Sequence, residues 1–537
     1  MDKASRQCTF LDAAETQDWA AVQESIASCD DLNVRGIGGQ TALMRAAQAG
    51  QDACVCALLD AGADIDLLDA DGQSALMYAA EAGNLACVRI LIEKGAQVDL
   101  QNMQRKSALM SAAKGGQQDC LRPLLEAGAR VDMQDGRGLS ALLIASVTGS
   151  ESCMRLLLEA SARVNLDDYF GQSALILAAE NGHSSGVRLL LENGAHVDHQ
   201  SDAGRSALMS ASVKGHENCL VLLLEAGAQV NLQDCRGRSA LLHAAQNGHV
   251  SCMRSLFAFG AYTEIKDDLG RSPLMAAAMP SIQNPSGSDI CAAINLVLDY
   301  DAHINACDRT GNTALHLAAK CGVNTSVCVL LGRGALIDQT NNTGNTAFMS
   351  AVQNRHVSTA RLLLRYGADV NALDNNGTSA LIIAVRNRDK AMVHLLLDRN
   401  ADLTITETRR RRNALHILLA SFEESSTITL PCISSIIQRL IAHKIPMNQA
   451  DWRGYCPLDL IVAWHDSQLH QAVRHDLFSY LVRHGADVNH GADHPERETA
   501  LIALLQNTPL PQLNDASLLL LNSYLTTAHK RRIILSG

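Results

Sequence analysis

Aromatic residues and prolines are scarce in this chain of 537 residues. Phe, Trp and Tyr make up 3% of it and it contains 10 prolines, although 47% of its residues are hydrophobic. A large globular core usually contains many aromatic side chains, because these bury the most apolar area per residue. The composition therefore favours thin helical layers packed with Ala, Leu and Val over one large core.

Signals for membranes and secretion are also missing. The chain has no uninterrupted run of 18 apolar residues, and its amino-terminal segment is not basic and apolar. We therefore expect a soluble protein that works in the cytoplasm, with the nucleus as the second possibility. Three Asn-x-Ser/Thr sequons, at Asn324, Asn341 and Asn376, would then have no access to glycosylation.

Catalytic and metal-binding patterns are absent or weak. There is no Gly-x-x-x-x-Gly-Lys-Ser/Thr phosphate loop, no Asp-Phe-Gly triplet, no Gly-x-Ser-x-Gly elbow and no Cys-x-x-Cys pair. His465, His470 and His475 are five residues apart, whereas ligands on one helix face are three or four apart. We expect no enzyme activity, no cofactor and no metal.

What the chain does contain is a repeat of 33 residues. A glycine position recurs at this spacing at Gly39, Gly72, Arg105, Gly138, Gly171, Gly204, Gly237 and Gly270, with Arg replacing Gly once. Self-similarity at a fixed period is typical of solenoids, in which each unit packs only on its neighbours.

One unit predicts two short helices. Ser206 is a good helix N-cap before Ala207, and Gly215 interrupts the first helix. Apolar residues from Cys219 onward then follow helical spacing until Gly227 ends the second helix. Such a pair cannot bury its apolar faces alone, so the copies must stack.

These units resemble the ankyrin repeat over about 12 to 14 copies, essentially the whole chain. The resemblance rests on Gly-x-Thr/Ser-x-Leu, Ala-Ala in the first helix, Gly-His turns such as Gly215-His216, Leu-Leu-Leu-Glu in the second helix, and Gly-Ala-x-Val-Asn/Asp. It implies an α-solenoid of helix-turn-helix repeats with short β-hairpin or loop fingers. It also implies a scaffold or adaptor that binds other proteins.

The chain departs from the family pattern in its Thr-Pro-Leu-His segment. Most copies read Ser/Thr-Ala-Leu-Met/Leu/Ile, although Pro273 and Pro457 keep the proline and His316 and His416 keep the histidine. Because that histidine bonds to adjoining loops in relatives, we expect cohesion between these repeats to depend on apolar packing instead.

The regularity of the repeat divides the chain into three parts. We expect a capping repeat over 1–38 and a regular array over 39–411, with a loop insert near 280–288. The part 412–537 contains degenerate repeats and a cap, with further inserts at 421–431 and 490–498.

Six of the 16 cysteines share one position of the second helix, again at multiples of 33 residues: Cys54, Cys87, Cys120, Cys153, Cys219 and Cys252. Helices in neighbouring repeats lie about 10 Å apart, beyond the roughly 7 Å Cα limit for a disulfide. We interpret these cysteines as small buried apolar residues in a reducing compartment.

The family resemblance implies a partner surface on the concave side. Transferred position by position, it comprises Arg137, Leu139, Tyr169, Phe170, Arg205, Lys214, Arg236, Arg238 and Arg271. These residues predict a basic stripe with an aromatic centre on a chain of net charge -11, suited to a partner segment with acidic and apolar residues. The alternative is that Phe170 packs on a neighbouring hairpin and the arginines form a solvated edge.

Other partners are less favoured. An acidic chain lacks the basic balance that nucleic-acid binding requires, and nothing predicts a small-molecule substrate or membrane insertion. Two basic runs, Arg409–Arg412 and Lys530–Arg532, have three interpretations. They are nuclear-import signals, or fingers that bind acidic groups, or solvated charges, which is the most common case for a charge run.

Two further hypotheses come from the resemblance. Thr508–Pro511 (Thr-Pro-Leu-Pro) faintly resembles the adaptor box of ubiquitin-ligase substrate receptors, which makes such a receptor the alternative function. Leu363–Asn371 resembles the Leu-x-x-x-x-x-Asp-Val-Asn target of an asparaginyl hydroxylase, which would modify Asn371. The alternative for Asn371 is that it only hydrogen-bonds the hairpin.

Overall fold

The computed structural model describes residues 10–279, 286–420, 430–463, 477, 478 and 480–486. The chain forms two compact units, Met1–Ala302 (unit 1) and His303–Gly537 (unit 2). Within the described residues both units are built from helix pairs. The β-structure of these residues is limited to isolated bridges, which join Asp167 to Ser173, Gln233 to Ser239 and Leu373 to Ser379.

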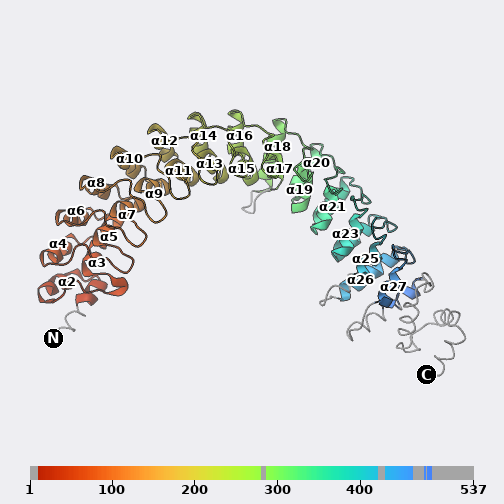
Figure 1. The fold of residues 1–537 in the computed structure, drawn as a ribbon, viewed down its shortest axis with the longest axis horizontal. Helices are drawn as coiled ribbons and strands as arrows, with labels where there is room; N and C mark the ends of the chain where they lie inside the picture. The colour runs from red at the N-terminus through yellow and green to blue at the C-terminus, as the bar shows by residue number, and fades with distance from the viewer. Residues whose placement is uncertain (1–9, 280–285, 421–429, 464–476, 479, 487–537) are drawn as a thin grey trace, which may run out of the picture. The chain divides into compact units, whose positions relative to one another are not determined.

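Unit 1 consists of two helix layers, which Figure 1 shows side by side. Residues 10–15 are helical, followed by α2 (Trp19–Ser25) and the 3₁₀ turns η1 (Ile26–Ser28) and η2 (Ile37–Gly39). The first helices of the repeats are α3 (Ala42–Gln48), α5 (Ala75–Ala82), α7 (Ala108–Gly115), α9 (Ala141–Thr148), α11 (Ala174–Asn181), α13 (Ala207–Lys214), α15 (Ala240–Asn247) and α17 (Pro273–Ala278). The second helices are α4 (Asp52–Asp60), α6 (Leu85–Glu93), α8 (Gln118–Glu126), α10 (Glu151–Glu159), α12 (Ser184–Glu192), α14 (Glu217–Glu225), α16 (Val250–Ala258) and α18 (Gly287–Asp299).

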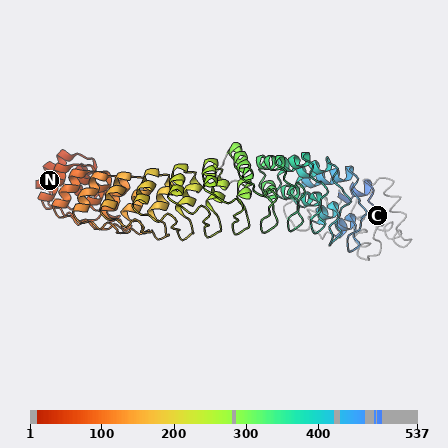
Figure 2. The same cartoon turned by 90° about the horizontal axis from the view of Figure 1, so that it is seen from above.

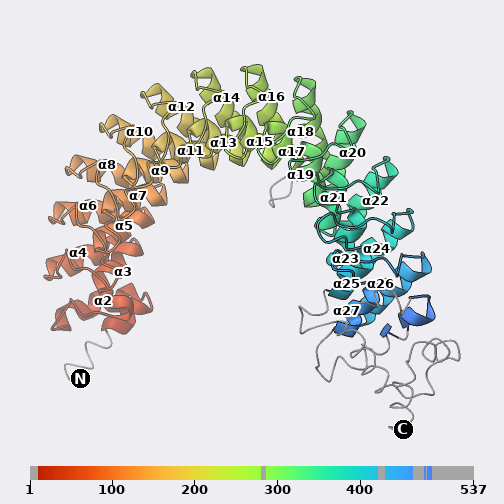
Figure 3. The ribbon, with the colours of Figure 1, turned by 45° about the vertical axis from the view of Figure 1, so that its right-hand side comes forward.

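Unit 2 repeats this arrangement, and Figure 3 separates its two layers. Its first helices are α19 (Ala314–Cys321), α21 (Ala347–Gln353), α23 (Ala380–Arg386), α25 (Ala414–Ala420) and α27 (Pro457–Ala463). Its second helices are α20 (Asn324–Gly332), α22 (Val357–Arg365), α24 (Lys390–Leu397) and α26 (Leu430–Ala442). Among the residues described in both units, no helix combines the length and the apolar composition needed to cross a bilayer.

Most first helices begin at a capping Ser or Thr. The Ser206 hydroxyl accepts a hydrogen bond from the backbone N–H of Met209, while the Ser206 backbone stays extended. Serines at the matching positions cap their helices in the same way: Ser74, Ser107, Ser140, Ser173, Ser239, Ser272 and Ser379. The predicted helix start at Ser206 is confirmed.

The second helix of this repeat ends in the glycine turn that the sequence predicts. Gly227 has a φ of 87°, a left-handed conformation that suits a residue without a Cβ. Its N–H bonds to the carbonyl of Leu224 and the N–H of Ala228 bonds to that of Leu223, each at 3.0 Å. These bonds satisfy carbonyls that the helix leaves open, and the chain turns into the next finger.

The apolar core lies between the two layers and continues from repeat to repeat. Leu208, Met209, Leu220 and Leu223 are at most 1% exposed. Full burial of each such side chain contributes about 1.5 to 3 kcal/mol. Helix α13 contacts α11 and α15, while α14 contacts α12 and α16, so each repeat buries its apolar faces against its neighbours.

Polar contacts also join neighbouring repeats. An Asn or Asp in one finger accepts a hydrogen bond from a backbone N–H 31 residues later, as Asn165 does from His196 at 2.8 Å. The histidines of the Gly-His turns hydrogen-bond the first helix of the preceding repeat, as the Nε2 of His249 does to the carbonyl of Val213 in α13, at 3.1 Å. The expectation that cohesion depends on apolar packing is therefore incomplete.

Two of the three expected inserts end two residues earlier than the sequence predicts, and the third, at 490–498, lies outside the described residues. Residues 280–285 lie outside the described part, but Gly287 and Ser288 form the first turn of α18. The hydroxyl of Ser286 caps this turn by accepting from the N–H of Asp289, whose carboxylate accepts from the N–H of Ser286. Likewise, α26 begins at Leu430, and the proline at 431 is compatible with this start because proline is tolerated in a first helical turn.

The six recurring cysteines are all buried and free. Burial raises the pKa of the Cys87 thiol to about 11, so this thiol stays protonated and unreactive near neutral pH. Their interpretation as small apolar core residues is confirmed.

Candidate partner-binding surface

A buried acidic residue shapes four of the five central fingers of unit 1, and Ser201 takes its position in the other. Asp168 accepts hydrogen bonds from the backbone N–H groups of Phe170 and Gln172, at 2.9 and 2.8 Å. Asp135, Asp234 and Asp267 make the same pair of bonds in neighbouring fingers. Such bonds fix a tight turn and leave the two residues after each aspartate at its tip.

Neighbouring fingertips are joined by backbone hydrogen bonds. Tyr169 donates to the carbonyl of Arg137 at 3.1 Å, and Asp202 donates to that of Phe170 at 3.0 Å. Figure 2 shows the fingers of unit 1 side by side. We call the joined tips the fingertip row: Gly136 and Arg137, Tyr169 and Phe170, Asp202 and Ala203, Cys235 and Arg236, Asp268 and Leu269.

The aromatic pair at the second tip of the row is open to solvent. Tyr169 is 55% exposed and Phe170 is 58% exposed. Gly138, with φ of 83°, makes room for the tyrosine, because a Cβ at this glycine would stand 2.5 Å from the Tyr169 nitrogen and 2.7 Å from its Cδ1. Tyr169 therefore lies against the preceding finger, while the exposed ring of Phe170 is available to a partner.

Two predicted arginines are bound within their own fingers. The Nη2 of Arg238 lies 2.9 Å from Oδ2 of Asp234, and the Nη2 of Arg271 lies 2.7 Å from Oδ2 of Asp267. Both aspartate side chains are only 2% exposed. These arginines hold the fingers in shape, and a partner would have to compete with buried carboxylates to engage them.

Three other predicted arginines keep open guanidinium groups. Arg137 and Arg236 are exposed at their fingertips, and Arg205 is half-buried beside the row. None of the three forms an ion pair with the described residues. They are therefore the cations of the predicted stripe that are best placed to meet acidic groups.

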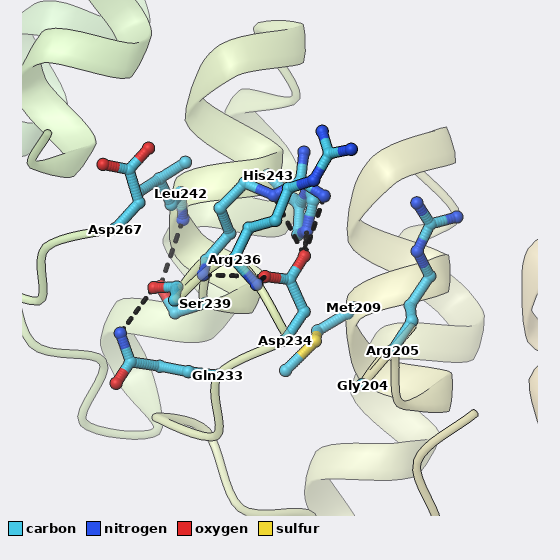
Figure 4. Close-up of polar contacts among 12 residues, drawn as sticks. Gly204, Arg205, Met209, Gln233, Asp234, Arg236, Ser239, Leu242, His243 and Asp267 are labelled. Atoms are coloured by element: carbon cyan, nitrogen blue, oxygen red, sulfur yellow. Dashed lines mark hydrogen bonds and ion pairs between the residues drawn. The ribbon is translucent and has the colours of Figure 1, made fainter. Parts of the chain in front are cut away.

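The finger of Arg236 also contains a bond to a buried histidine. Figure 4 shows Asp234 beneath His243, whose Nε2 lies 3.1 Å from Oδ2 of the carboxylate. Burial alone raises the pKa of Asp234, but the bonds from His243, from two backbone N–H groups and from the Arg238 guanidinium outweigh it and hold that pKa well below its usual range. Burial lowers the pKa of His243, so a neutral His243 donates to a charged Asp234 at neutral pH.

Lys214 and Leu139 lie outside the row itself. Lys214 is exposed in the last turn of α13, where a cation interacts favourably with the helix end. Leu139 is half-buried and donates its N–H to Asp135 inside the finger. Four of the nine predicted residues thus lie in the fingertip row, and the other five lie beside it: Leu139, Arg205, Lys214, Arg238 and Arg271.

Sequence reasoning missed several exposed residues at equivalent tips. Ile37, Met103 and Leu269 are 75%, 77% and 58% exposed. Their positions relative to the recurring glycine match those of Tyr169 and Phe170, so the repeat register was the signal that could have found them. Asp202 and Asp268 are also exposed at tips, and they interrupt the basic stripe.

A polar hollow of about 240 Å³ adjoins Met103. Lys106 and Lys114 line it together with Asp71 and Glu81, and Lys114 lies 2.7 Å from Glu81. Because its charges are largely compensated, this hollow adds shape rather than net charge to the surface.

Asn371 has a structural role. Its side-chain oxygen accepts a hydrogen bond from the backbone N–H of Asp402 at 2.8 Å, and its own N–H donates to Asp369 at 2.9 Å. This is the hairpin bond that the alternative interpretation predicts, and the same bond occurs at Asn165 and Asn305. Hydroxylation of Asn371 stays a prediction.

Several predicted features lie outside the described residues: His465, His470 and His475, Thr508–Pro511, and Lys530–Arg532. Within the described part, no group of three or more His, Cys, Asp or Glu side chains is placed to hold a metal ion.

Comparison with known proteins identifies the family. The model for "Ankyrin repeats (3 copies)" matches in overlapping windows, over 10–102, 43–135, 109–201, 142–234, 176–267, 208–286, 241–341 and 324–407. The chain belongs to the ankyrin repeat family. Its fold is the helical solenoid that the 33-residue period predicts.

Among solved structures, the ankyrin repeat domain of human ASB11 matches with 27% sequence identity and a TM-score of 0.39. The match covers 42% of this chain and 99% of that domain. A search of curated proteins found no significant match.

Proposed function

We propose that this ankyrin repeat protein is a non-catalytic scaffold that binds a segment of a partner protein along the fingertip row of unit 1. Ankyrin repeats generally serve protein interactions, which supports the class of function. The observation that carries the proposal is the exposed pair Tyr169 and Phe170, fixed on a tip that hydrogen bonds join to both neighbouring fingers.

The chemistry of the row defines the partner segment. Aromatic and Arg side chains dominate interface energetics, so an apolar anchor should cover Phe170 while Asp or Glu side chains meet Arg137 and Arg236. These two arginines are three finger steps apart, roughly 30 Å at ordinary helix packing distances. An extended segment of about nine residues spans that length.

Affinity capture with the double variant Tyr169→Ala, Phe170→Ala tests the proposal. We expect a partner captured by the intact chain to lose at least about 2 kcal/mol of binding free energy, roughly 30-fold in Kd. The matched control is Phe259→Ala, Tyr262→Ala, because these residues are 45% and 66% exposed elsewhere in unit 1. A folded test variant that keeps every partner at full affinity would refute the role of the row.

The alternative function, a substrate receptor of a ubiquitin ligase, depends on Thr508–Pro511, outside the described residues. It predicts that deleting this segment abolishes capture of ligase subunits while a partner of the fingertip row still binds. For either function we propose a cytoplasmic site of action, with the nucleus as the second possibility.

A further inference from the structure

A second binding site is built into unit 2, where one finger is longer than its neighbour. In the preceding finger, Asp374 donates its N–H to the carbonyl of Thr378, four residues later; in this one, Glu407 donates to Arg412, five residues later. Gly377 has the left-handed backbone conformation in the preceding finger, with φ of 70°, and in this finger Arg411 has it, with φ of 49°. The extra residue adds a further arginine to the tip.

A hollow of about 420 Å³ lies beside this finger. Four arginines line it, Arg386, Arg409, Arg410 and Arg412, together with two acidic residues, Asp374 and Glu407. Its apolar lining comes from Ile417 and Ala420 of α25. The hollow therefore combines a net positive charge with an apolar part.

The acidic residues already have partners within the protein. Glu407 forms an ion pair with Arg386. The carboxylate of Asp374 accepts hydrogen bonds from the backbone N–H groups of Asn376 and Thr378, at 2.8 and 2.7 Å. These contacts hold the finger in shape, and both acidic groups of the lining are already paired or hydrogen-bonded within the protein.

The arginines are compensated unequally. Arg412 lies 3.4 Å from Asp451, a fully buried carboxylate of the next finger. Arg409 and Arg410 are exposed and form no ion pair with the described residues. Two guanidinium groups therefore remain free at the rim of the hollow, on a chain whose net charge is -11.

An exposed tryptophan stands on the adjacent finger. Trp452 donates its backbone N–H to the carbonyl of Arg410 at 3.1 Å, so the two tips are directly joined. Its side chain is 55% exposed, and the guanidinium carbon of Arg453 lies 4.8 Å from the centre of its ring. Trp and Arg are the residue types most enriched among the residues that contribute most to interfaces.

We propose that Arg409, Arg410 and Trp452 form a binding site for an acidic peptide segment of a partner protein, separate from the fingertip row of unit 1. Two neighbouring carboxylates of the segment meet Arg409 and Arg410, whose planar forks match carboxylate geometry. An apolar side chain of the segment covers the exposed Trp452. A free inorganic anion satisfies only the charged part of this surface, and an acidic chain with one local basic tip disfavours nucleic acid.

Fluorescence anisotropy with the full chain tests this proposal. The probe is a labelled peptide of alternating Glu and Leu residues, and its counterpart has Gln in place of Glu. We expect the Glu peptide to bind and the Gln peptide not to bind. The double variant Arg409→Gln, Arg410→Gln should weaken binding by about tenfold or more, because each charge-assisted contact is stronger than a neutral one.

The matched control is Arg361→Gln, Arg365→Gln, which removes the same charge from exposed arginines of α22 in the same unit. We expect this variant to bind like the unmodified chain. If both variants weaken peptide binding equally, the loss follows the net charge of the chain rather than Arg409 and Arg410, and the proposal is overturned. Tighter, Arg409-dependent binding of a labelled single-stranded oligonucleotide than of the peptide would overturn it as well.

A measurement on the unmodified chain keeps the proposal testable if the variants misfold. Phenylglyoxal modifies accessible arginines, and mass spectrometry locates the modified residues. Saturating Glu peptide should protect Arg409 and Arg410 while Arg361 still reacts. Unchanged modification of Arg409 and Arg410 in the presence of bound peptide would place the peptide elsewhere.

Discussion

Asp234 offers the sharpest test of how the fingers are held in shape. Its carboxylate accepts hydrogen bonds from the backbone N–H groups of Arg236 and Arg238, at 2.9 Å each, and from His243 at 3.1 Å. In Asp234→Ala the two backbone groups lose an acceptor, which costs about 1 kcal/mol each where water replaces it. His243 is 3% exposed, so its buried N–H stays unsatisfied and costs about 1 kcal/mol or more.

The expected loss of local stability is therefore about 3 kcal/mol. Because each repeat contacts only its neighbours, the loss should be concentrated in the repeats of α13 to α16. Hydrogen exchange read by mass spectrometry should show amide exchange in α15 accelerated roughly 100-fold. Far-UV circular dichroism shows whether the rest of the array stays helical.

Two substitutions of the same residue type serve as controls. Asp202→Ala removes an exposed fingertip carboxylate and should change stability by less than about 0.5 kcal/mol. Asp267→Ala removes an aspartate that binds Arg271 but no histidine, so its cost should fall between the other two. If Asp234→Ala exchanges no faster than Asp202→Ala, the buried carboxylate does not hold the finger and the reasoning is wrong.

Three further predictions concern other features of the chain. Burial lowers the pKa of His243 in the folded chain. The contribution of His243 to stability is therefore complete above its unfolded pKa of about 6.5 and is lost as pH falls through its folded pKa. Urea unfolding midpoints at pH 7.5 and 5.5 should differ less for His243→Gln than for the unmodified chain. Gly138→Ala should lower the free energy of unfolding by about 2 kcal/mol or more, because the added Cβ meets the Tyr169 backbone. Gly128→Ala is the control, since Gly128 has a similar φ of 81° and no atom within 4 Å of the added Cβ, and it should cost only about 1 kcal/mol in thermal unfolding. The hydroxylation hypothesis for Asn371 requires a gain of one oxygen in the mass of the peptide that contains it, from animal cells with an active asparaginyl hydroxylase; an unmodified peptide leaves Asn371 with its hairpin role alone.

The fold was predictable because its information is local and repeated. Ser206 caps the start of a helix and Gly227 ends one, and the 33-residue period repeats these signals along the array, with Thr41 in place of the serine and Ser161 in place of the glycine. The predicted boundaries were wrong where a local capping signal outweighed a loop-like composition. Gly287 and Ser288 look like loop residues, but the cap at Ser286 starts a helix there.

The site was only partly predictable, because exposure and pairing depend on side-chain direction. The register placed Tyr169 and Phe170 at a tip, and both are exposed there. The same register could not show that Arg238 turns back onto Asp234, since this pair closes a loop rather than a helix turn. The register also could not show that the finger from Glu407 to Arg412 has one extra residue, or that Arg411 takes the left-handed backbone conformation there.

Site-specific photocrosslinking tests the central claim most directly. A benzophenone side chain in place of Phe170 keeps an aromatic group at the tip, and the same side chain in place of Tyr262 is the matched control at another exposed position of unit 1. The account predicts that a partner of this protein crosslinks through position 170 and not through position 262. Crosslinking through position 262, with none through position 170, would contradict it.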